Sequence, residues 1–247
     1  MESYVLLIIP LIAAVAFYIK GLTGFGPALI FIPLGALIIS PQPVIVASSF
    51  LDLLAGLIML RTVQQVKRYS FLTGIIVAMA AGTVAGVYLL SVVPSETLRF
   101  LLGGLVLFLG VWFALFRMSG TQEQRLDQLP DRCNKKDLGY SILAGLSGGF
   151  FGISGPPVIW HLGRRFQMAA FRDVLIVVFV FAAIVRILLF TAAGLVTLDS
   201  MKVVALAIPG LLAGLLLGNR AFLTINEVIF SRVVGTILIL LSIMLIL

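Results

Sequence analysis

The chain has few charged residues and almost none of the side chains that bind metals or carry out redox chemistry. Only 11% of its 247 residues are Asp, Glu, Lys or Arg, and it contains one cysteine and one histidine. The single cysteine, Cys133, excludes an intramolecular disulfide and a cluster of metal-binding thiolates. The lone histidine, His161, leaves zinc or haem almost without ligands. We therefore expect neither a metal nor a cofactor.

The residues that are present are mostly apolar. Hydrophobic residues make up 61% of the chain and the mean hydropathy is +1.20, so the polar residues are too few to cover a globule in water. This composition predicts an all-α polytopic membrane protein, with the lipid bilayer as its surroundings. The first apolar run has no charged leader and no cleavage site, so we expect it to be retained. The formal charge of +7 lies in short loops between spans, which indicates membrane topology rather than nucleic-acid binding.

A polar, glycine-rich break at Lys20–Pro27 interrupts the first apolar segment. The flanking runs Tyr4–Ile19 and Ala28–Ile39 each cover ~20–25 Å as helices, against ~30 Å of hydrocarbon. Irregular backbone at membrane depth survives only where protein, water or a ligand satisfies its polar groups. A helix that restarts after Gly26 points unpaired N–H groups into the break, which suits an anion. Two interpretations stay open: a broken hairpin, or two spans joined by a loop with Lys20 in water.

The break recurs in the second half of the chain, within Gly145–Pro157. A single ungapped shift, which carries Gly21 onto Gly149 and is called the repeat offset below, also aligns glycines of a second window further along each half. The aligned pairs are Gly21 with Gly149, Gly24 with Gly152, Gly26 with Ser154, Gly82 with Gly210, and Gly86 with Gly214. One offset that serves both windows predicts an internal duplication. The spacings Gly82-x3-Gly86 and Gly210-x3-Gly214 indicate close helix packing.

The paired breaks, residues 21–34 and 148–159, resemble those of the TauE/SafE sulfite exporter family, also called the 4-toluene sulfonate uptake permeases. The likeness extends over nearly the whole chain. It implies movement of a small sulfur-containing anion such as sulfite, sulfoacetate or another sulfonate. This chain has Pro27-Ala28 and Pro156-Pro157 where family members often have more glycine.

We expect two membrane repeats, residues 1–117 and 138–247, joined by a basic cytoplasmic linker, 118–137, with 8–10 membrane segments in all. Each repeat holds a glycine-broken hairpin, or two short spans, and three further spans. Basic loops at 62–69, 118–137 and 164–172 fall on one side when the N-terminus is outside, as the positive-inside rule requires. An odd number of crossings per repeat makes the repeats inverted, so that the two tips meet near the midplane. The expected location is the cell inner (plasma) membrane.

Candidate substrate-binding residues lie in and beside the two breaks. They supply one ammonium group, three hydroxyls and glycines that let backbone N–H groups approach a ligand. These residues are Lys20, Gly21, Thr23, Gly24, Gly26, Ser147, Gly148, Gly152, Ser154 and Gly155. The alternative interpretation is that the hydroxyls cap interrupted helices and that Lys20 is interfacial.

Three ionisable residues are candidates for coupling or for a second anion site. Asp52 lies near the middle of its span and is either a proton carrier or the partner of a buried cation. Arg186 can pair with Asp52, bind the anion or extend outward to the interface. His161 follows the second break and either titrates in a proton-coupled cycle or is an interfacial residue.

These features favour a secondary transporter working by alternating access between repeats, with proton coupling left open. The family resemblance implies that the direction is export. A passive anion channel and an integral-membrane enzyme are the alternatives. An enzyme is disfavoured because such enzymes hold clusters of His, Asp or Glu at one membrane face. The expected partners are a small anion and the bilayer, with no nucleic acid; a homodimer is left open.

Overall fold

The computed structural model describes residues 3–24, 26–63, 69–115, 130, 133–163, 166, 168–220 and 227–246, and this part of the chain is all-helical, as predicted. Its helices, in chain order, are α1 (Ser3–Thr23), α2 (Pro27–Ile38), α3 (Pro41–Met59), the short 3-10 helix η1 (Leu60–Thr62), α4 (Tyr69–Val92), α5 (Ser95–Leu115), α6 (Lys135–Phe151), α7 (Gly155–Leu162), α8 (Met168–Ala192), α9 (Leu198–Arg220) and α10 (Glu227–Ile246). Six of them, α1, α3, α4, α5, α8 and α9, are long and apolar enough to cross a membrane.

Both breaks are built in the same way from glycine and proline. Gly24 and Gly152 adopt left-handed φ values of 82° and 74°, and each ends its helix by donating its N–H to the carbonyl oxygen four positions earlier. A left-handed glycine is the usual stop for a helix. Proline then occupies the first turn of the next helix, where its missing N–H costs nothing. The sequence therefore forces a stop and a restart at matching places in the two halves.

The breaks are shorter than the sequence suggested. Lys20, Gly21 and Thr23 belong to α1, which has 21 residues and is therefore ~31 Å long, enough to cross the hydrocarbon core. In the second half, residues 145–151 likewise belong to α6. The expectation that the first arm covers only ~20–25 Å was thus wrong, because Gly21 continues α1 against α9.

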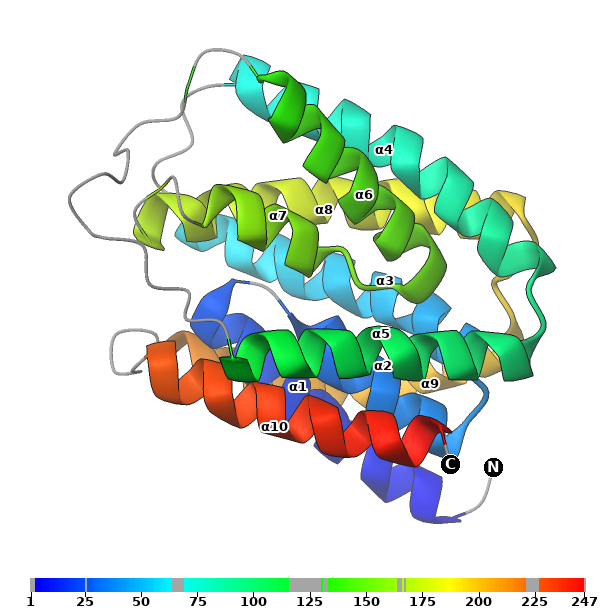
Figure 1. Ribbon diagram of the computed structural model, residues 1–247. Helices are drawn as coiled ribbons and strands as arrows, with labels where there is room; N and C mark the ends of the chain where they lie inside the picture. The colour runs from blue at the N-terminus through cyan, green and yellow to red at the C-terminus, as the bar shows by residue number, and fades with distance from the viewer. Residues whose placement is uncertain are drawn as a thin grey trace.

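The repeat offset relates the helices as well as the glycines. It carries α1 to α6, α2 to α7, α3 to α8, α4 to α9 and α5 to α10, with the residue ranges given above. Packing is reciprocal, since α1 lies along α9 while α6 lies along α4. The counterparts α5 and α10 pack on each other, as do α3 and α8. In Figure 1 the α4–α6 pair forms the upper edge and the α5–α10 pair the lower front, with α3, α7 and α8 between them.

Two of these counterpart pairs run in opposite directions. In the α3–α8 pair, Gly56 faces Val180, whereas Asp52, earlier in α3, meets Arg186, later in α8. In the α5–α10 pair, Gly110 lies against Ile239, whereas Arg99 shares a pocket with residues 244 and 245. A helix and its copy therefore cross the molecule in opposite senses at both of these contacts.

The predicted small-x3-small packing is confirmed. A β-carbon on Gly86 would clash with the carbonyl oxygen of Leu146, and one on Gly214 would clash with that of Ala14. The α4–α6 and α1–α9 pairs therefore approach to backbone contact, as membrane helices do when glycines line the interface. Large apolar side chains such as Leu7, Tyr88 and Leu216 remain exposed on these helices, as on a lipid-facing surface.

The close helix contacts make a stability prediction. We expect Gly86→Val and Gly214→Val each to destabilise the protein by about 1–3 kcal/mol, the usual cost of overpacking, because the new side chains must push two backbones apart. Gly104→Val in α5 is the matched control, since nothing lies within 4 Å of a β-carbon there. Thermal unfolding in detergent measures the difference, and three equal melting temperatures would contradict this packing.

Candidate functional site

A cluster of three buried charged side chains joins the two halves of the protein. The Lys20 ammonium lies 2.7 Å from Asp52 Oδ1, and Arg186 Nη2 lies 3.0 Å from Asp52 Oδ2. All three residues are almost completely buried, with exposed fractions of 2% for Lys20, 8% for Asp52 and 2% for Arg186. Asp52 therefore holds a cation from each half, because Lys20 belongs to α1 and Arg186 to α8.

Each member of the cluster comes from a helix that packing holds in place. Asp52 lies in the middle part of α3, whose contact with α8 is close because Gly56 has no side chain to separate it from Val180. Lys20 lies in the last turn of α1, beside the Phe17 ring, and its ammonium also donates to the Asp52 carbonyl oxygen at 3.2 Å. The arrangement is asymmetric, since the repeat offset places Gly148 where the first half has Lys20.

Arg186 also connects the cluster to the second break. Its Nη1 donates to the carbonyl oxygen of Gly152 at 3.0 Å, and Gly152 is the left-handed residue that ends α6. Gly152 lies close to α2 and α3, since a β-carbon added to it would meet Ile32 and Ser48. The charged cluster and the second break therefore form one site at the contact between the halves.

Three buried polar groups at this site have no hydrogen-bond partner among the described residues: Ser49 Oγ, Ser154 Oγ and Arg186 Nε. Ser49 precedes Asp52 by one helical turn, and Ser154 begins α7 without capping it through its side chain. A buried polar group without a partner costs roughly 1–3 kcal/mol. Two cations facing one carboxylate also leave one positive charge unmatched. Hydroxyl groups and a guanidinium N–H can donate hydrogen bonds to an oxyanion, and the excess positive charge attracts it.

The first break is held by a different arginine. Arg172 Nη2 donates to the Gly21 carbonyl oxygen at 3.2 Å and to Asn219 Oδ1 at 2.7 Å, and its side chain covers Gly24. Arg172 belongs to α8 and is 7% exposed, so placing it in a cytoplasmic loop was wrong. The end of α1, the start of α8 and the end of α9 therefore meet at the first break.

His161 lies apart from the charged cluster. Its Nε2 is 2.6 Å from Asp137 Oδ1, and its ring stacks on Tyr140 with the centroids 4.6 Å apart. Asp137 also forms the capping box of α6 with Asn134. This contact joins the last turn of α7 to the first turn of α6, at the opposite end of the hairpin from Gly152. The contact between His161 and Asp137 therefore holds the open end of the second hairpin together.

The remaining predicted residues divide between the breaks and a neighbouring cavity. Gly26 has φ 88° and precedes α2, while Gly155 begins α7. Gly148 packs against the Ser154 hydroxyl, where a β-carbon would clash. Ser147 donates to the Ala144 carbonyl oxygen and lines an apolar cavity beside α5. Thr23 is the last residue of α1, and its side chain lies outside the described part of the structure.

Sequence reasoning missed several residues that contribute to these sites. Ser48 and Ser49 are polar residues one turn before Asp52 in an otherwise apolar span, and that proximity was a usable signal. Arg172 and Asn219 gave no such signal, because each follows or ends a polar loop and looked interfacial. Asp137 looked like the end of the linker, although its position three residues after Asn134 fits a capping box at the start of a helix.

Among the comparisons with known proteins, a match to a family model agrees with this architecture. No curated protein and no solved structure matches the chain. A family model described as sulfite exporter TauE/SafE matches residues 9–245, nearly the full length. Together with the apolar helices and the buried site between two halves, this match shows that the chain belongs to the TauE/SafE sulfite exporter family, a family of multi-pass membrane transporters for sulfur-containing anions.

Proposed function

We propose that the protein exports a small sulfur-containing anion, sulfite or an organosulfonate such as sulfoacetate, across the cell inner membrane by alternating access. The observation that carries this proposal is the unmatched positive charge of the Lys20–Asp52–Arg186 cluster beside the second break. A buried charge without a counterion is costly, so such a site favours a state in which an anion is bound. Sulfite and sulfonates present several acceptor oxygens, which match the donors at the site.

The binding mode follows from these donors. The anion replaces part of the Asp52 contact at Lys20 or Arg186, and it accepts hydrogen bonds from Arg186 Nε and the Ser154 hydroxyl. Asp52 pairs with both cations and orients them while the site is empty, so release of the anion does not leave two bare charges. The same carboxylate is our candidate for coupling to protons, because a proton on Asp52 strengthens the attraction between the site and an anion.

Alternating access requires two repeats of opposite orientation that can move against each other. Reciprocal packing of α1 on α9 and α6 on α4, with opposed directions in α3–α8 and α5–α10, supports two repeats of opposite orientation. We propose that residues 1–117 and 138–247 are these repeats and that they rock about the α3–α8 contact, where the charged cluster lies. The end of α5 and the beginning of α6 lie away from the two chain termini in Figure 1. This agrees with an N-terminus outside and a linker inside the cell.

Loss of the Lys20 charge tests the binding role directly. We expect Lys20→Gln to weaken sulfite binding about tenfold or more, equivalent to ~1.4 kcal/mol, because a buried cation near the anion is removed. Lys202→Gln is the control: Lys202 is exposed, and its only described ion pair is with Asp199. Solid-supported-membrane electrophysiology with purified protein gives both affinities. An unchanged affinity in the Lys20 variant would remove this residue from the site.

Removal of the Asp52 charge should have the opposite effect to removal of the Lys20 charge: sulfite should stabilise the variant more strongly. Asp52→Asn leaves Lys20 and Arg186 facing each other without a counterion, which should destabilise the empty protein by about 3–5 kcal/mol. Added sulfite should then raise the melting temperature more in Asp52→Asn than in the unmodified protein, since the anion supplies the missing negative charge. Equal sulfite-induced shifts in the two proteins would indicate that the anion does not bind at this cluster.

A counterflow assay distinguishes a carrier from a channel. We expect proteoliposomes loaded with unlabelled sulfite to accumulate radiolabelled sulfite above its external concentration, because a carrier exchanges one bound anion for another. An imposed pH gradient that changes the rate would support proton coupling. Equilibration without transient accumulation would mean a passive anion channel and would overturn alternating access.

A further inference from the structure

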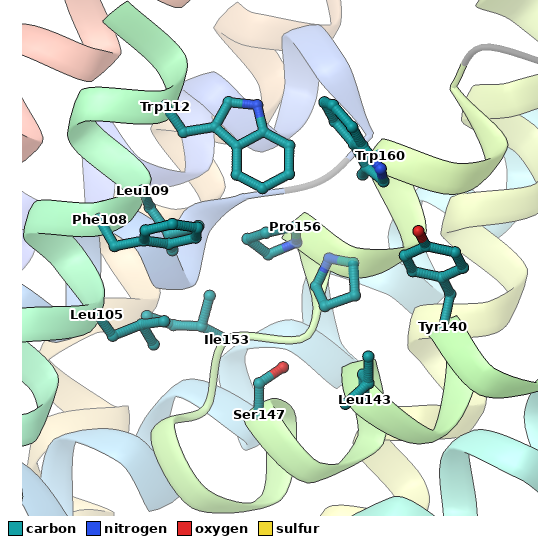
Figure 2. A pocket seen from close by; sticks show the side chains of 11 residues that line it. Leu105, Phe108, Leu109, Trp112, Tyr140, Leu143, Ser147, Ile153, Pro156 and Trp160 are labelled. Atoms are coloured by element: carbon teal, nitrogen blue, oxygen red, sulfur yellow. The ribbon is translucent and has the colours of Figure 1, made fainter. Parts of the chain in front are cut away.

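A crevice between α5 and the α6–α7 hairpin has no role in the transport site described above. Its volume is about 360 Å³, within the range of ~300–1,000 Å³ seen for small-molecule sites. Nearly all of its lining is apolar: Leu105 and Phe108 from α5 face Leu143 from α6 across the opening. Phe108 and Leu143 are themselves largely exposed, so the crevice opens sideways toward the lipid. Figure 2 shows α5 on one side, α6 on the other and Pro156 of α7 between them.

One end of the crevice carries all the aromatic residues with polar atoms. Trp112 and Trp160 meet edge to face with ring centroids 4.3 Å apart, and Tyr140 lies beside them. This is the end where α5 finishes, α6 starts and α7 finishes. Because Trp and Tyr concentrate at the membrane–water interface, the crevice extends from the interface into the bilayer, toward Ile153 at the second break.

A basic residue lies beyond the aromatic end of the crevice, on the same face of α6. Lys136 precedes Tyr140 by one helical turn and Leu143 by two, so all three share one face of α6. Lys136 is exposed, in the first turn of α6. Apolar wall, interfacial aromatic residues and a basic residue therefore follow one another along the membrane normal, in the order acyl chain, glycerol region and phosphate of a phospholipid.

The duplication shows that these features are not a by-product of the fold. The repeat offset places Ile8, Ile12, Ile32 and Leu240 where the crevice has Lys136, Tyr140, Trp160 and Trp112. The equivalent place, between α10 and the α1–α2 hairpin, therefore has the corresponding helices without the interfacial aromatic residues or the cation. A surface that only faces lipid would not require aromatic and basic residues at one of the two places and apolar residues at the other. A specific site for a lipid headgroup would require them.

We propose that this crevice binds one acyl chain of an anionic phospholipid, with the phosphate at Lys136. Lipid bound here lies against α5 on one side and the second hairpin on the other. The lipid therefore packs against the hairpin whose break holds the Gly152–Arg186 contact. The proposal does not depend on which anion is transported.

The two tryptophans of the chain both line the crevice, which allows a direct test. The full-length protein is reconstituted in phosphatidylcholine bilayers that contain increasing amounts of either brominated phosphatidylglycerol or brominated phosphatidylcholine, whose acyl bromines quench tryptophan fluorescence. We expect half-maximal quenching at an about fivefold lower fraction of phosphatidylglycerol, since one basic residue near the surface favours anionic lipid by that factor.

Matched variants separate a specific site from general lipid contact. Lys136→Gln should abolish the preference for phosphatidylglycerol, while Lys202→Gln should leave it unchanged. Ser147→Phe, which fills the crevice, should reduce quenching by both lipids, unlike Leu188→Phe on the lipid-facing side of α8. Equal quenching by both lipids in the unmodified protein, or a preference that survives Lys136→Gln, would overturn the proposal. Weak quenching by both lipids would also overturn it, because the crevice would then be covered by a second copy of the chain.

Discussion

The salt bridges of Asp52 with Lys20 and Arg186 are the interaction on which this structure depends. Neither cation can stay at that depth without a counterion, and Asp52 is the one carboxylate that the described structure places beside them. The carboxylate therefore holds α1, α3 and α8 together across the two halves. Because it matches only one of two positive charges, the same interaction that stabilises the fold also prepares it for an anion.

The surrounding architecture serves to bring these three helices together. Glycine contacts let α1 lie against α9 and α6 against α4, and a left-handed glycine ends each broken helix at the same relative position. Arg186 then fixes the second break through Gly152, and Arg172 fixes the first through Gly21. Each break is thus held by an arginine of α8, although only one of these arginines reaches the acidic partner in α3.

The sequence was informative where structure follows from local chemistry and repetition. The repeat offset, read from glycines, predicted which segments of the two halves correspond, because duplicated sequences place their helix stops and restarts alike. The position of Lys20 could not be predicted, because Gly21 continues α1 only through its contact with α9, which lies in the other half of the chain. For the same reason Arg186 kept three open roles in the sequence, and its pairing with Asp52 depends on the rotation of α8 against α3. The hairpin of α6 and α7 followed from the second break, but no pattern showed that His161 and Asp137 would meet at its open end.

The most direct test of the central claim is an experimental structure of the protein with selenite, a sulfite analogue whose selenium scatters anomalously. The account predicts one anomalous peak within hydrogen-bond distance of the Lys20 ammonium or the Arg186 guanidinium, beside Gly152 and Ser154. An anion bound only elsewhere, with the Lys20–Asp52–Arg186 cluster closed and unchanged, would contradict it.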